Sequence, residues 1–497
     1  MQSWSDPSAA RRGPVIAVVG GGASGTLAVI HLLGEAARQQ VPLRVALIDR
    51  HGRHGLGQAY STAHPAHLLN SPAHVMSALA GDPGHLTRWA DRAGLSRDGF
   101  LSRSDYGRYL RELLEETERA ARPAARVSHI TARVIAMRRS DHGRALRLYL
   151  AADGRIDADV AILATGNLPS APLIPDPGNG RYIADPWEPG ALKPAMDGSP
   201  VIVAGTGLTM LDVVTTVTGN HPQTTVRAVS RHGMLPQVHR GYGGPADAVW
   251  LPVLSDPGAP VRLPELVWQV RSAMASRPNH WQDVVDAVRP HVPSLWRRLP
   301  DRDKRLFLRH VARYWEVHRH RMPPATAQRI TELRCTGRLS VLRGQVTGIA
   351  EVDDGPAATL ARGAAGTAAA APGQPGGRLR IRLEQDGSVT DLAAGWLINA
   401  TGPGTDLTRT SDPLLRDLVS QGLARPDPLR LGLDASLDGA VLDAAGTASA
   451  TLFTLGPTLR GVRYETTAIP EIRDQAAALA GLLTAAPWAR EHPGSAA

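Results

Sequence analysis

The chain has 497 residues, 43% of them hydrophobic, which exceeds the usual size of one domain and is enough to fill two or three cores. A lone cysteine, Cys335, excludes an internal disulfide and a Cys-x-x-Cys redox pair, and no metal cluster is indicated. The net charge of +9 comes mostly from scattered arginines, so nucleic acid is not an expected partner. With no long apolar run and no signal peptide, we expect a cytoplasmic protein without a membrane contact.

The first predicted unit is a strand, a helix and a second strand, after a polar tail. Residues 15–20 ("VIAVVG") have the pattern of a buried strand, residues 25–40 that of an amphipathic helix, and residues 43–49 that of another buried strand. The turn between them has three glycines in G-x-G-x-x-G spacing, which permit a tight turn, close approach to a diphosphate and close helix packing. A carboxylate ends the second strand, where it can accept ribose hydrogen bonds. The residues of this predicted dinucleotide site are Gly20, Gly22, Ala23, Ser24, Gly25, Asp49 and Arg50.

A second unit of the same kind begins at Pro200. It keeps two of the glycines and has Met210 in place of the third, so its helix is expected to lie slightly farther from its strand. Where the first unit has an acid, the second has a serine followed by an arginine, which favours the 2′-phosphate of NADPH over NADH; the alternative is an arginine in a solvated loop. The residues of this site are Gly205, Gly207, Leu208, Thr209, Ser230 and Arg231.

The fold class predicted from these units is α/β, with two Rossmann-like three-layer dinucleotide-binding domains and a helical insertion. The first domain is expected at residues 14–175 and 391–485, and the second at 176–390 with the insertion at about 263–328; residues 1–13 and 486–497 are expected to be flexible tails. The low-complexity segment after residue 353 is expected to be a mobile loop. Two strands end in Ala-Thr-Gly, where small residues suit a crossover beside a cofactor: Thr165 and Gly166, and Gly402.

Two dinucleotide sites in one chain are explained if the first binds FAD and the second binds NADPH, which reduces the FAD. Several strings resemble those of bacterial FAD/NAD(P)-binding proteins with two dinucleotide-binding domains, over residues 15–483: "GLGQAYST", "HLLNSPAHVMSA", "ATGNLP", "GTGLTMLDVV", "SRHGMLPQVHR" and "GPTLRGVRYETTAIPEIRDQA". The resemblance implies that the first glycine motif and Asp49 hold the adenosine side of FAD. It also implies that further residues approach the flavin, with loop-forming roles as the alternative for Asn70 and Thr467: Asn70, Ser71, Met76, Gly402, Gly456, Glu465 and Thr467.

This group is related to flavin-dependent monooxygenases that oxygenate nitrogen, such as the nitrosuccinate-forming enzymes. The resemblance therefore implies a monooxygenase in which a flavin C4a-(hydro)peroxide oxygenates a small amine or amino acid, with oxygen as co-substrate. Ketone oxygenation is disfavoured, because Trp187 is present without the glycine and histidine of the Baeyer–Villiger signature. Two alternatives stay open: a reductase or oxidase that inserts no oxygen, and a flavin-bound sensor whose basic insertion docks an acidic partner. The sequence indicates neither a catalytic pair nor an oligomeric state.

The insertion carries a cationic string, "HRHRMPP", at the predicted end of a helix. Cations are favourable there because of the helix dipole, which is one explanation of the string. The other is that Arg319 or Arg321 faces the flavin cleft and binds a substrate carboxylate or the NADPH phosphates. We expect Cys335 to be buried, together with four tryptophans that anchor the helices: Trp268, Trp281, Trp296 and Trp315.

Overall fold

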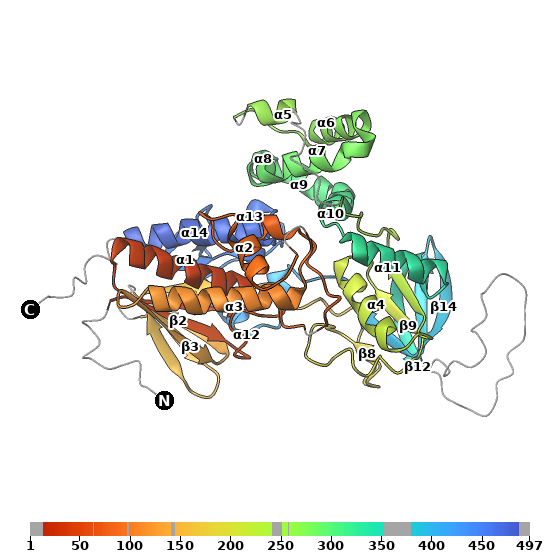
Figure 1. Ribbon diagram of the computed structural model, residues 1–497, viewed down its shortest axis with the longest axis horizontal. Helices are drawn as coiled ribbons and strands as arrows, with labels where there is room; N and C mark the ends of the chain where they lie inside the picture. Colours follow the sequence, from red (N-terminus) through yellow and green to blue (C-terminus); the bar gives the residue numbers. More distant parts are fainter. Residues whose placement is uncertain are drawn as a thin grey trace, which may run out of the picture.

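The computed structural model describes residues 13–62, 64–96, 99–140, 145–240, 251–256, 258–351 and 379–486. Two α/β units lie side by side, with a cluster of helices standing over them (Figure 1). The predicted mobile segment after residue 353 and most of both predicted tails lie outside the described residues. Among the described helices, none has the length and apolar character that crossing a membrane requires.

The first unit is built on a six-stranded sheet with the order β16-β17-β7-β1-β2-β3, in which only β16 is antiparallel to its neighbour. Its strands are β1 (Val15–Val19), β2 (Leu43–Asp49), β3 (Ala125–Thr131), β7 (Val160–Leu163), β16 (Ala440–Leu442) and β17 (Ala448–Thr454). Helices α1 (Ala23–Gln39), α3 (Arg103–Ala120) and α14 (Ile469–Ala485) cover one face. The antiparallel strands β4 (Val134–Arg139), β5 (Leu146–Leu150) and β6 (Arg155–Ala158), with helix α12 (Pro413–Ser420), cover the other.

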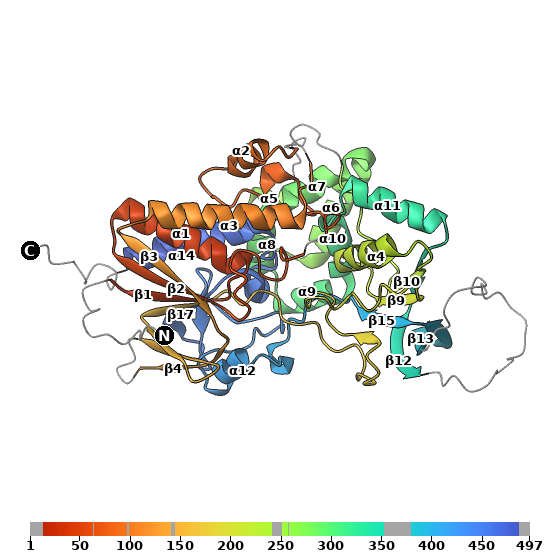
Figure 2. The same cartoon turned by 60° about the horizontal axis from the view of Figure 1, so that its bottom comes forward.

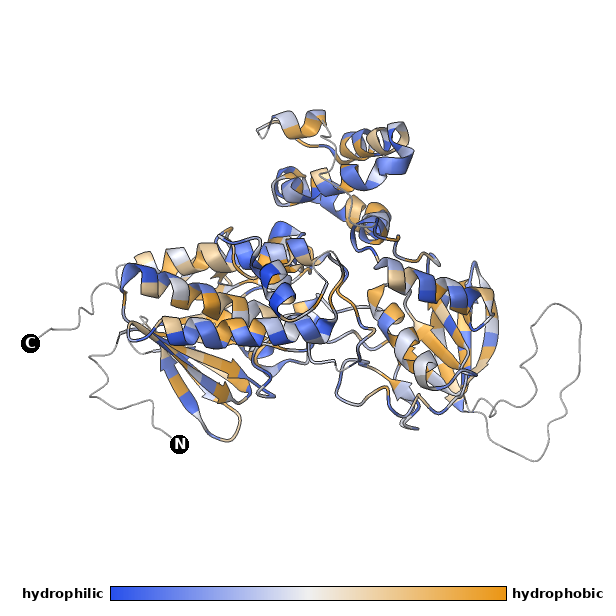
Figure 3. Cartoon of the chain, viewed as in Figure 1, coloured by the Kyte–Doolittle hydropathy of each residue, from blue (hydrophilic) through white to orange (hydrophobic). Residues whose placement is uncertain are grey.

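Burial on both faces explains why the strands are continuous apolar runs. In β1, Ile16 and Val18 pack into the core beneath the helices, while Ala17 and Val19 pack into the core beneath the antiparallel strands. Parallel sheets covered on both sides have this composition, and orange segments alternate with fewer blue ones on the strands in Figure 3. The predicted three-layer arrangement is thereby confirmed for the first unit.

The second unit repeats this plan on a five-stranded parallel sheet with the order β11-β10-β9-β15-β8. Its strands are β8 (Tyr182–Ile183), β9 (Val201–Ala204), β10 (Val226–Ser230), β11 (Leu339–Arg343) and β15 (Trp396–Asn399). Helices α4 (Leu208–Asn220) and α11 (Pro324–Cys335) pack on one face. The antiparallel strands β12 (Gln345–Glu351), β13 (Leu379–Gln385) and β14 (Ser388–Ala394) pack on the other. The two units thus share one order of elements, in which three parallel strands joined by helices are followed by three antiparallel strands and a parallel strand, from β1 to β7 in the first unit and from β9 to β15 in the second.

Strand β15 corrects the predicted domain boundary at residue 391. It pairs in parallel with β9, with Leu397 opposite Ile202, and so belongs to the second sheet. The chain returns to the first unit only after Asn399. A short apolar strand pattern does not indicate which of two similar sheets the strand joins, because that choice depends on tertiary packing.

The helical insertion lies between β10 and α11 and also differs from its predicted bounds of 263–328. It comprises α5 (Pro252–Ser255), α6 (Leu263–Ser276), α7 (Trp281–Val288), α8 (Val292–Arg298), α9 (Asp301–Leu306), a π-helical turn η5 (Phe307–Val311) and α10 (Ala312–Arg319). Helix α11 lies outside it, because Ala327, Ile330 and Leu333 pack into the core of the second unit. In the turned view of Figure 2 the insertion helices lie across the junction of the two units.

Two burial predictions for this region are wrong. Trp268 is 67% exposed on α6, and Cys335 is exposed at the end of α11. Trp296 is buried as predicted and donates its Nε1–H to the Gly461 carbonyl oxygen (2.7 Å), whereas Trp281 and Trp315 are half-buried. Helical spacing placed all four tryptophans on helices, but the core that the insertion buries is small and covers only some of them.

Short helices complete the description: η2 (Ala73–Val75), α2 (His85–Arg92), η3 (Pro278–His280), η4 (Arg289–His291), η6 (Leu407–Arg409), η7 (Gly456–Leu459) and α13 (Arg460–Arg463). Polar contacts fasten the two units to each other at α4. Arg103 Nη2 donates to Asp212 Oδ2 (2.9 Å), and His67 Nε2 lies 2.9 Å from Thr216 Oγ1. Arg103 also lies over the ring of Trp187, 5.5 Å from its centroid.

Candidate functional site

The first cradle is the turn between β1 and α1. Gly20 has φ +114°, and a Cβ atom on it would lie 2.2 Å from the Ala164 carbonyl oxygen at the end of β7. A Cβ atom on Gly25 would lie 1.8 Å from the Gly20 carbonyl oxygen. These distances leave no room for any side chain, so the first and third glycines are required by the close packing of turn, helix and neighbouring strand.

Asp49 stands beside this turn at the end of β2. Its Oδ2 accepts the Gly21 N–H (3.1 Å), and its Oδ1 accepts the N–H groups of His51 (2.9 Å) and Arg53 (3.0 Å). Burial acts to raise the pKa of Asp49, but these three donors outweigh it and hold the pKa below its usual range. The carboxylate is therefore ionised, and Oδ2 can accept one more hydrogen bond. Arg50 turns outward, with Nη2 3.8 Å from Glu188 on the surface.

Several polar atoms near the first cradle are buried and have no hydrogen-bond partner within the described residues. They are Thr165 Oγ1, just beyond β7, and both ring nitrogens of His54, whose Nδ1 would be 2.9 Å from a Cβ atom on Gly21. Buried polar groups are usually satisfied, so such orphans indicate a ligand that completes them. A dinucleotide with hydroxyl, amide and ring donors and acceptors fits this surface.

The other predicted FAD residues lie in several places around the first unit. Gly456, with φ +76°, lies against Ser24 at the start of α1, where a Cβ atom would be 2.6 Å from Ser24 Oγ. Gly166 and Thr467 line the cleft described below. Ser71 is buried and Asn70 half-buried in the loop before η2. Met76, in contrast, is 4% exposed and packs within the first core, which does not fit the predicted flavin-facing role.

The second cradle repeats the first in detail. Gly205 has φ +118°, and a Cβ atom on it would lie 2.1 Å from the Ala400 carbonyl oxygen at the end of β15. Gly207 precedes α4 with open space around it, and Met210 is fully buried behind the turn. Gly402 follows β15, lies beside this cradle and lines the cleft that Gly166 and Thr467 also line, and its place next to the flavin stays a prediction.

A cleft of about 610 Å³ opens from the second cradle and runs between the two units. Both Ala-Thr-Gly crossovers, the strand end at Ser230 and the C-terminal segment contribute to its walls. The residues that carry polar or charged groups into it include Thr206, Thr209, Ser230, Arg231, His232, Arg313, Glu316, His320, Thr401, Arg460 and Thr467. Leu208 lines it as well. The described residues contain no group of three or more His, Cys, Asp or Glu side chains placed to hold a metal ion.

One face of α10 forms a wall of this cleft, which the sequence analysis did not identify. Arg313, Glu316 and Val317 line it at positions i, i+3 and i+4, and His320, the residue that follows the last turn of α10, lines it as well. This spacing places them on one side of a helix. The π-helical turn η5 ends at Val311, immediately before α10. Single π-turns are rare and often found at functional sites. In the sequence, this wall could have been identified from polar residues that recur with the 3.6-residue period of a helix.

Arg313 joins the insertion to the second cradle. Its Nη2 donates to Thr206 Oγ1 (3.0 Å) and to the Met234 carbonyl oxygen (2.6 Å), and Thr206 Oγ1 lies 2.9 Å from Ser230 Oγ. Burial and the charges of Arg231, Arg313 and Arg343 lower the pKa of His232. Arg231 itself is exposed at the mouth of the cleft. Positive charge therefore gathers at the strand end where a 2′-phosphate is expected.

Glu316 is the acidic centre of the α10 face. It accepts hydrogen bonds from Arg460 Nη2 (2.5 Å) and Tyr464 Oη (3.2 Å) through Oε1, and its Oε2 lies 3.0 Å from His320 Nε2. Burial acts to raise the pKa of Glu316, but His320, Arg460 and Tyr464 bring it down to about 2. Burial raises the pKa of the Tyr464 hydroxyl well above its usual value. Glu316 is therefore a firmly ionised carboxylate that fixes the groups around it.

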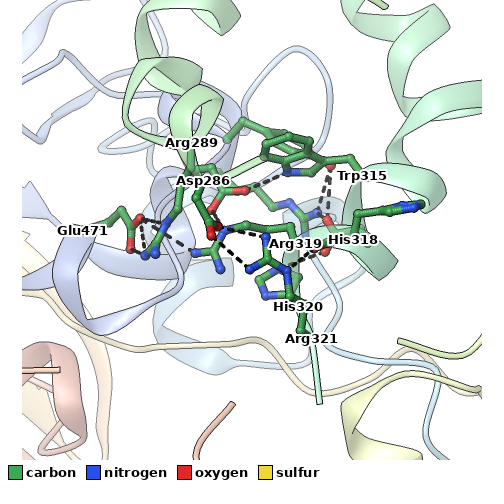
Figure 4. A network of polar contacts seen from close by, with 12 residues as sticks. Asp286, Arg289, Trp315, His318, Arg319, His320, Arg321 and Glu471 are labelled. Atoms are coloured by element: carbon green, nitrogen blue, oxygen red, sulfur yellow. Dashed lines mark hydrogen bonds and ion pairs between the residues drawn. The ribbon is translucent and has the colours of Figure 1, made fainter. Parts of the chain in front are cut away.

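The predicted substrate arginines lie on the other side of α10, in buried ion pairs (Figure 4). Arg321 is 2% exposed, and its two terminal nitrogens donate to Asp286 (2.9 and 3.1 Å). Arg319 is 5% exposed, with Nε 3.3 Å from Glu465 Oε2, and Trp315 Nε1 donates to Glu465 Oε1 (2.8 Å). Neither arginine lines the cleft. Their positions, and that of the predicted flavin contact Glu465, fit an internal network that fastens α10 to the C-terminal segment.

Comparisons with known proteins agree with this architecture. Residues 17–168 match the family model of FAD-NAD(P)-binding proteins, so this part of the chain is an FAD/NAD(P)-binding domain. The L-aspartate N-monooxygenase (nitrosuccinate-forming) of Streptomyces davaonensis is 28% identical over 272 residues. That match covers 44% of this chain and 41% of the length of that enzyme.

Solved structures match nearly the whole chain at low identity. Ornithine hydroxylase from Pseudomonas aeruginosa has a TM-score of 0.57 at 14% identity, over 95% of this chain and 98% of that one. L-Lysine 6-monooxygenase from Pseudomonas syringae has a TM-score of 0.59 at 14% identity, over 95% and 99%. Bacillithiol disulfide reductase from Bacillus cereus has a TM-score of 0.51 at 12% identity, over 95% and 98%. The chain thus has the fold of two-dinucleotide-domain flavoproteins, which oxygenases and reductases share, so the site must distinguish between these activities.

Proposed function

We propose that the protein is an FAD-dependent, NADPH-reduced monooxygenase that transfers one oxygen atom to the nitrogen of a small amine or amino acid. The observation that carries the proposal is the cleft, because one continuous space connects a cation-rich second cradle with the small-residue crossover at Gly166 beside the first cradle. A reductant and a redox cofactor held in these two places would share a space from which solvent can be excluded. The oxygenase names among the similar proteins support the same activity.

In this proposal the first cradle holds FAD. The turn at Gly20 and Gly22 would receive the diphosphate at the start of α1, and Asp49 Oδ2 would accept a ribose hydroxyl. Thr165, Gly166 and Gly456 would approach the cofactor farther along, and Asn70, Ser71 and Thr467 would face the flavin. When bound, FAD would take a hydride from NADPH and activate molecular oxygen, chemistry that side chains do not supply.

The second cradle would hold NADPH. Gly205, Gly207 and the first turn of α4, with Leu208 and Thr209, would receive its diphosphate. Ser230 in place of an acid removes repulsion toward a 2′-phosphate, and Arg231 at the cleft mouth can offer charge-assisted hydrogen bonds. The positive charge at this strand end therefore favours NADPH over NADH.

The remaining polar groups of the cleft would bind the substrate. Arg319 and Arg321 do not line the cleft, so we assign the carboxylate of an amino-acid substrate to Arg460, whose Nη2 also donates to Glu316. Arg460 lines the cleft, and its Nε is buried without a hydrogen-bond partner among the described residues. A guanidinium is well suited to a carboxylate because its donors match the two oxygens.

The decisive experiment supplies the purified yellow protein with NADPH, oxygen and one of L-aspartate, L-ornithine, L-lysine or cadaverine. The expected result is a product heavier by one oxygen atom in mass spectrometry, formed in proportion to the NADPH oxidised. Stoichiometric hydrogen peroxide with every amine would identify an oxidase. NADPH oxidation that requires a quinone or another electron acceptor would identify a reductase. A dithiol relay is excluded because the chain has only Cys335, which does not line the cleft.

A further inference from the structure

Oxygenation at nitrogen requires a free amine, and neither FAD nor NADPH would remove the proton of an ammonium substrate. An aliphatic amine at neutral pH is almost entirely an ammonium ion, as the reference pKa of about 10.4 for a lysine amine illustrates. An ammonium nitrogen has no lone pair with which to accept oxygen. A site that carries out the proposed reaction therefore needs a group that removes one proton from the bound ammonium. This inference rests on the proposed function, whose failure the experiment below detects separately.

Three residues that line the cleft, among those described, have an imidazole or carboxylate side chain that could accept a proton: His232, Glu316 and His320. Glu316, with a pKa of about 2, is too weak a base to take a proton from an ammonium ion. His232 lies among arginines whose charge opposes its protonation and lowers its pKa. Only His320 has an anionic partner, because its Nε2 lies 3.0 Å from Glu316 Oε2.

The contact with Glu316 also determines which nitrogen of His320 is free to act. An ionised carboxylate can only accept, so Nε2 carries the hydrogen that is donated to Oε2, and Nδ1 keeps its lone pair. Glu316 is held in turn by Arg460 and Tyr464, which leaves it little freedom to move. The charge of the neighbouring Arg321 is paired with Asp286, to which both of its terminal nitrogens donate. The side chain of His320 is 26% exposed, which leaves it accessible from the cleft.

We propose that His320 is the catalytic base that deprotonates the amine substrate, and that Glu316 is the residue that positions it. The N–H bond of the ammonium breaks, its proton forms a bond to Nδ1 of His320, and the electron pair stays on the substrate nitrogen. No electrons are transferred in this step. The imidazolium that results is stabilised by the carboxylate of Glu316, in the same relation that a carboxylate and a histidine have in hydrolytic triads.

The test compares H320Q with the wild type and with H318Q, using the amine that the wild type oxygenates best among L-aspartate, L-ornithine, L-lysine and cadaverine. His318 is a matched control, since it lies on α10 two residues before His320 but does not line the cleft, with Nδ1 2.7 Å from the Tyr314 carbonyl oxygen. Wild type and H318Q should show a plateau in log(kcat/KM) between the histidine and amine pKa values. H320Q should instead rise tenfold per pH unit up to the amine pKa, because only free amine reacts. At neutral pH its kcat/KM should fall by about 100-fold.

Two further measurements distinguish proton transfer from a structural role. Anaerobic reduction of the flavin by NADPH should be unchanged in H320Q, and added imidazole should restore part of the lost rate. A plateau that persists in H320Q would overturn the proposal, as would loss of flavin reduction together with turnover.

A measurement without turnover keeps the inference testable if no amine is oxygenated. In the NMR spectrum of the oxidised wild type, the Cε1–H resonance of His320 is the histidine resonance that is absent from the spectrum of oxidised H320Q. For at least one of the four amines, added in turn to the oxidised wild-type holoprotein, the pH midpoint of this resonance should fall, because an ammonium ion bound beside Nδ1 opposes protonation of the ring. If His320 responds to none, it does not accept the proton. If His320 responds and no product forms with NADPH and oxygen, the proposed oxygenase function fails while the assignment of the base stands.

Discussion

Arg313 reaches from the helical insertion to the second cradle, where its Nη2 donates to Thr206 Oγ1 over 3.0 Å. Through Thr206 it is linked to Ser230, the residue that replaces an acid at this strand end. The insertion therefore contributes a side chain to the second cradle, for which we propose NADPH as the ligand. We predict that R313A weakens NADPH binding by about 1.5–3 kcal/mol, the range for a hydrogen bond to a charged group, while FAD content is unchanged. Fluorescence titration with NADPH measures this, with the exposed Arg305 of α9 changed to Ala as the control; equal affinities in both variants would contradict it.

Arg231 carries a separate prediction, because it is exposed at the cleft mouth beside Ser230. R231A should lose about 1.5–3 kcal/mol of affinity for NADPH and almost none for NADH, since only NADPH offers a 2′-phosphate to the guanidinium. Steady-state kinetics with both nucleotides, or direct titration, give the ratio. If both nucleotides weaken equally, Arg231 does not read the 2′-phosphate and belongs to the solvated loop.

Replacing the first glycine of each cradle by alanine should remove the binding of a different cofactor. A methyl group at residue 20 would meet the Ala164 carbonyl oxygen at 2.2 Å, and one at residue 205 would meet that of Ala400 at 2.1 Å. Both positions also have φ near +115°, where alanine is strained. G20A should be purified without flavin absorbance, and G205A should stay yellow but not be reduced by NADPH. G207A is the milder control, because nothing lies within 4 Å of the place that its methyl group would occupy. A yellow G20A protein would place FAD elsewhere.

The contact between the two units predicts a difference between two ion pairs that arginines of α3 form, one with Asp212 on α4 and one within α3. The side chains of Arg103 and Asp212 are 16% and 11% exposed, whereas those of Arg108 and Asp105 are 44% and 29% exposed. R103A leaves a carboxylate mostly buried without its partner, which should cost about 3 kcal/mol of unfolding free energy. R108A should cost less than about 1 kcal/mol. Urea unfolding measures both, and similar costs would show that the Arg103 pair does not fasten the units.

Glu316 predicts how stability depends on pH. Its folded-state pKa is about 2, below the ordinary value of 4.5, so its ion pairs stabilise the fold fully above pH 4.5 and progressively less as pH falls toward 2. Wild type should exceed E316Q in unfolding free energy by an amount on the order of 2–3 kcal/mol between about pH 5 and 7. Urea unfolding at several pH values should show this difference shrinking below pH 4.5. A difference that stays constant to pH 3 would mean that Glu316 has an ordinary pKa in the folded protein.

The sequence by itself determined the two cradles. A turn that packs a backbone carbonyl 2 Å from a missing Cβ, as at Gly20 and Gly205, tolerates only glycine, so the spacing of glycines after an apolar strand carries the geometry directly. The residues Asp49 and Ser230 could also be located from the sequence, because each ends the strand that directly follows the helix of its cradle.

Only the tertiary structure decided which sheet β15 joins, and hence on which side Gly402 lies, because two similar sheets compete for the same short apolar strand. It also decided which face of α10 meets the cleft. Arginines close together in sequence end in opposite environments, with Arg313 beside the nucleotide cradle and Arg321 buried against Asp286. Their partners lie on elements distant in sequence, and a side chain's direction on a helix gains meaning only when the neighbours of that helix are in place.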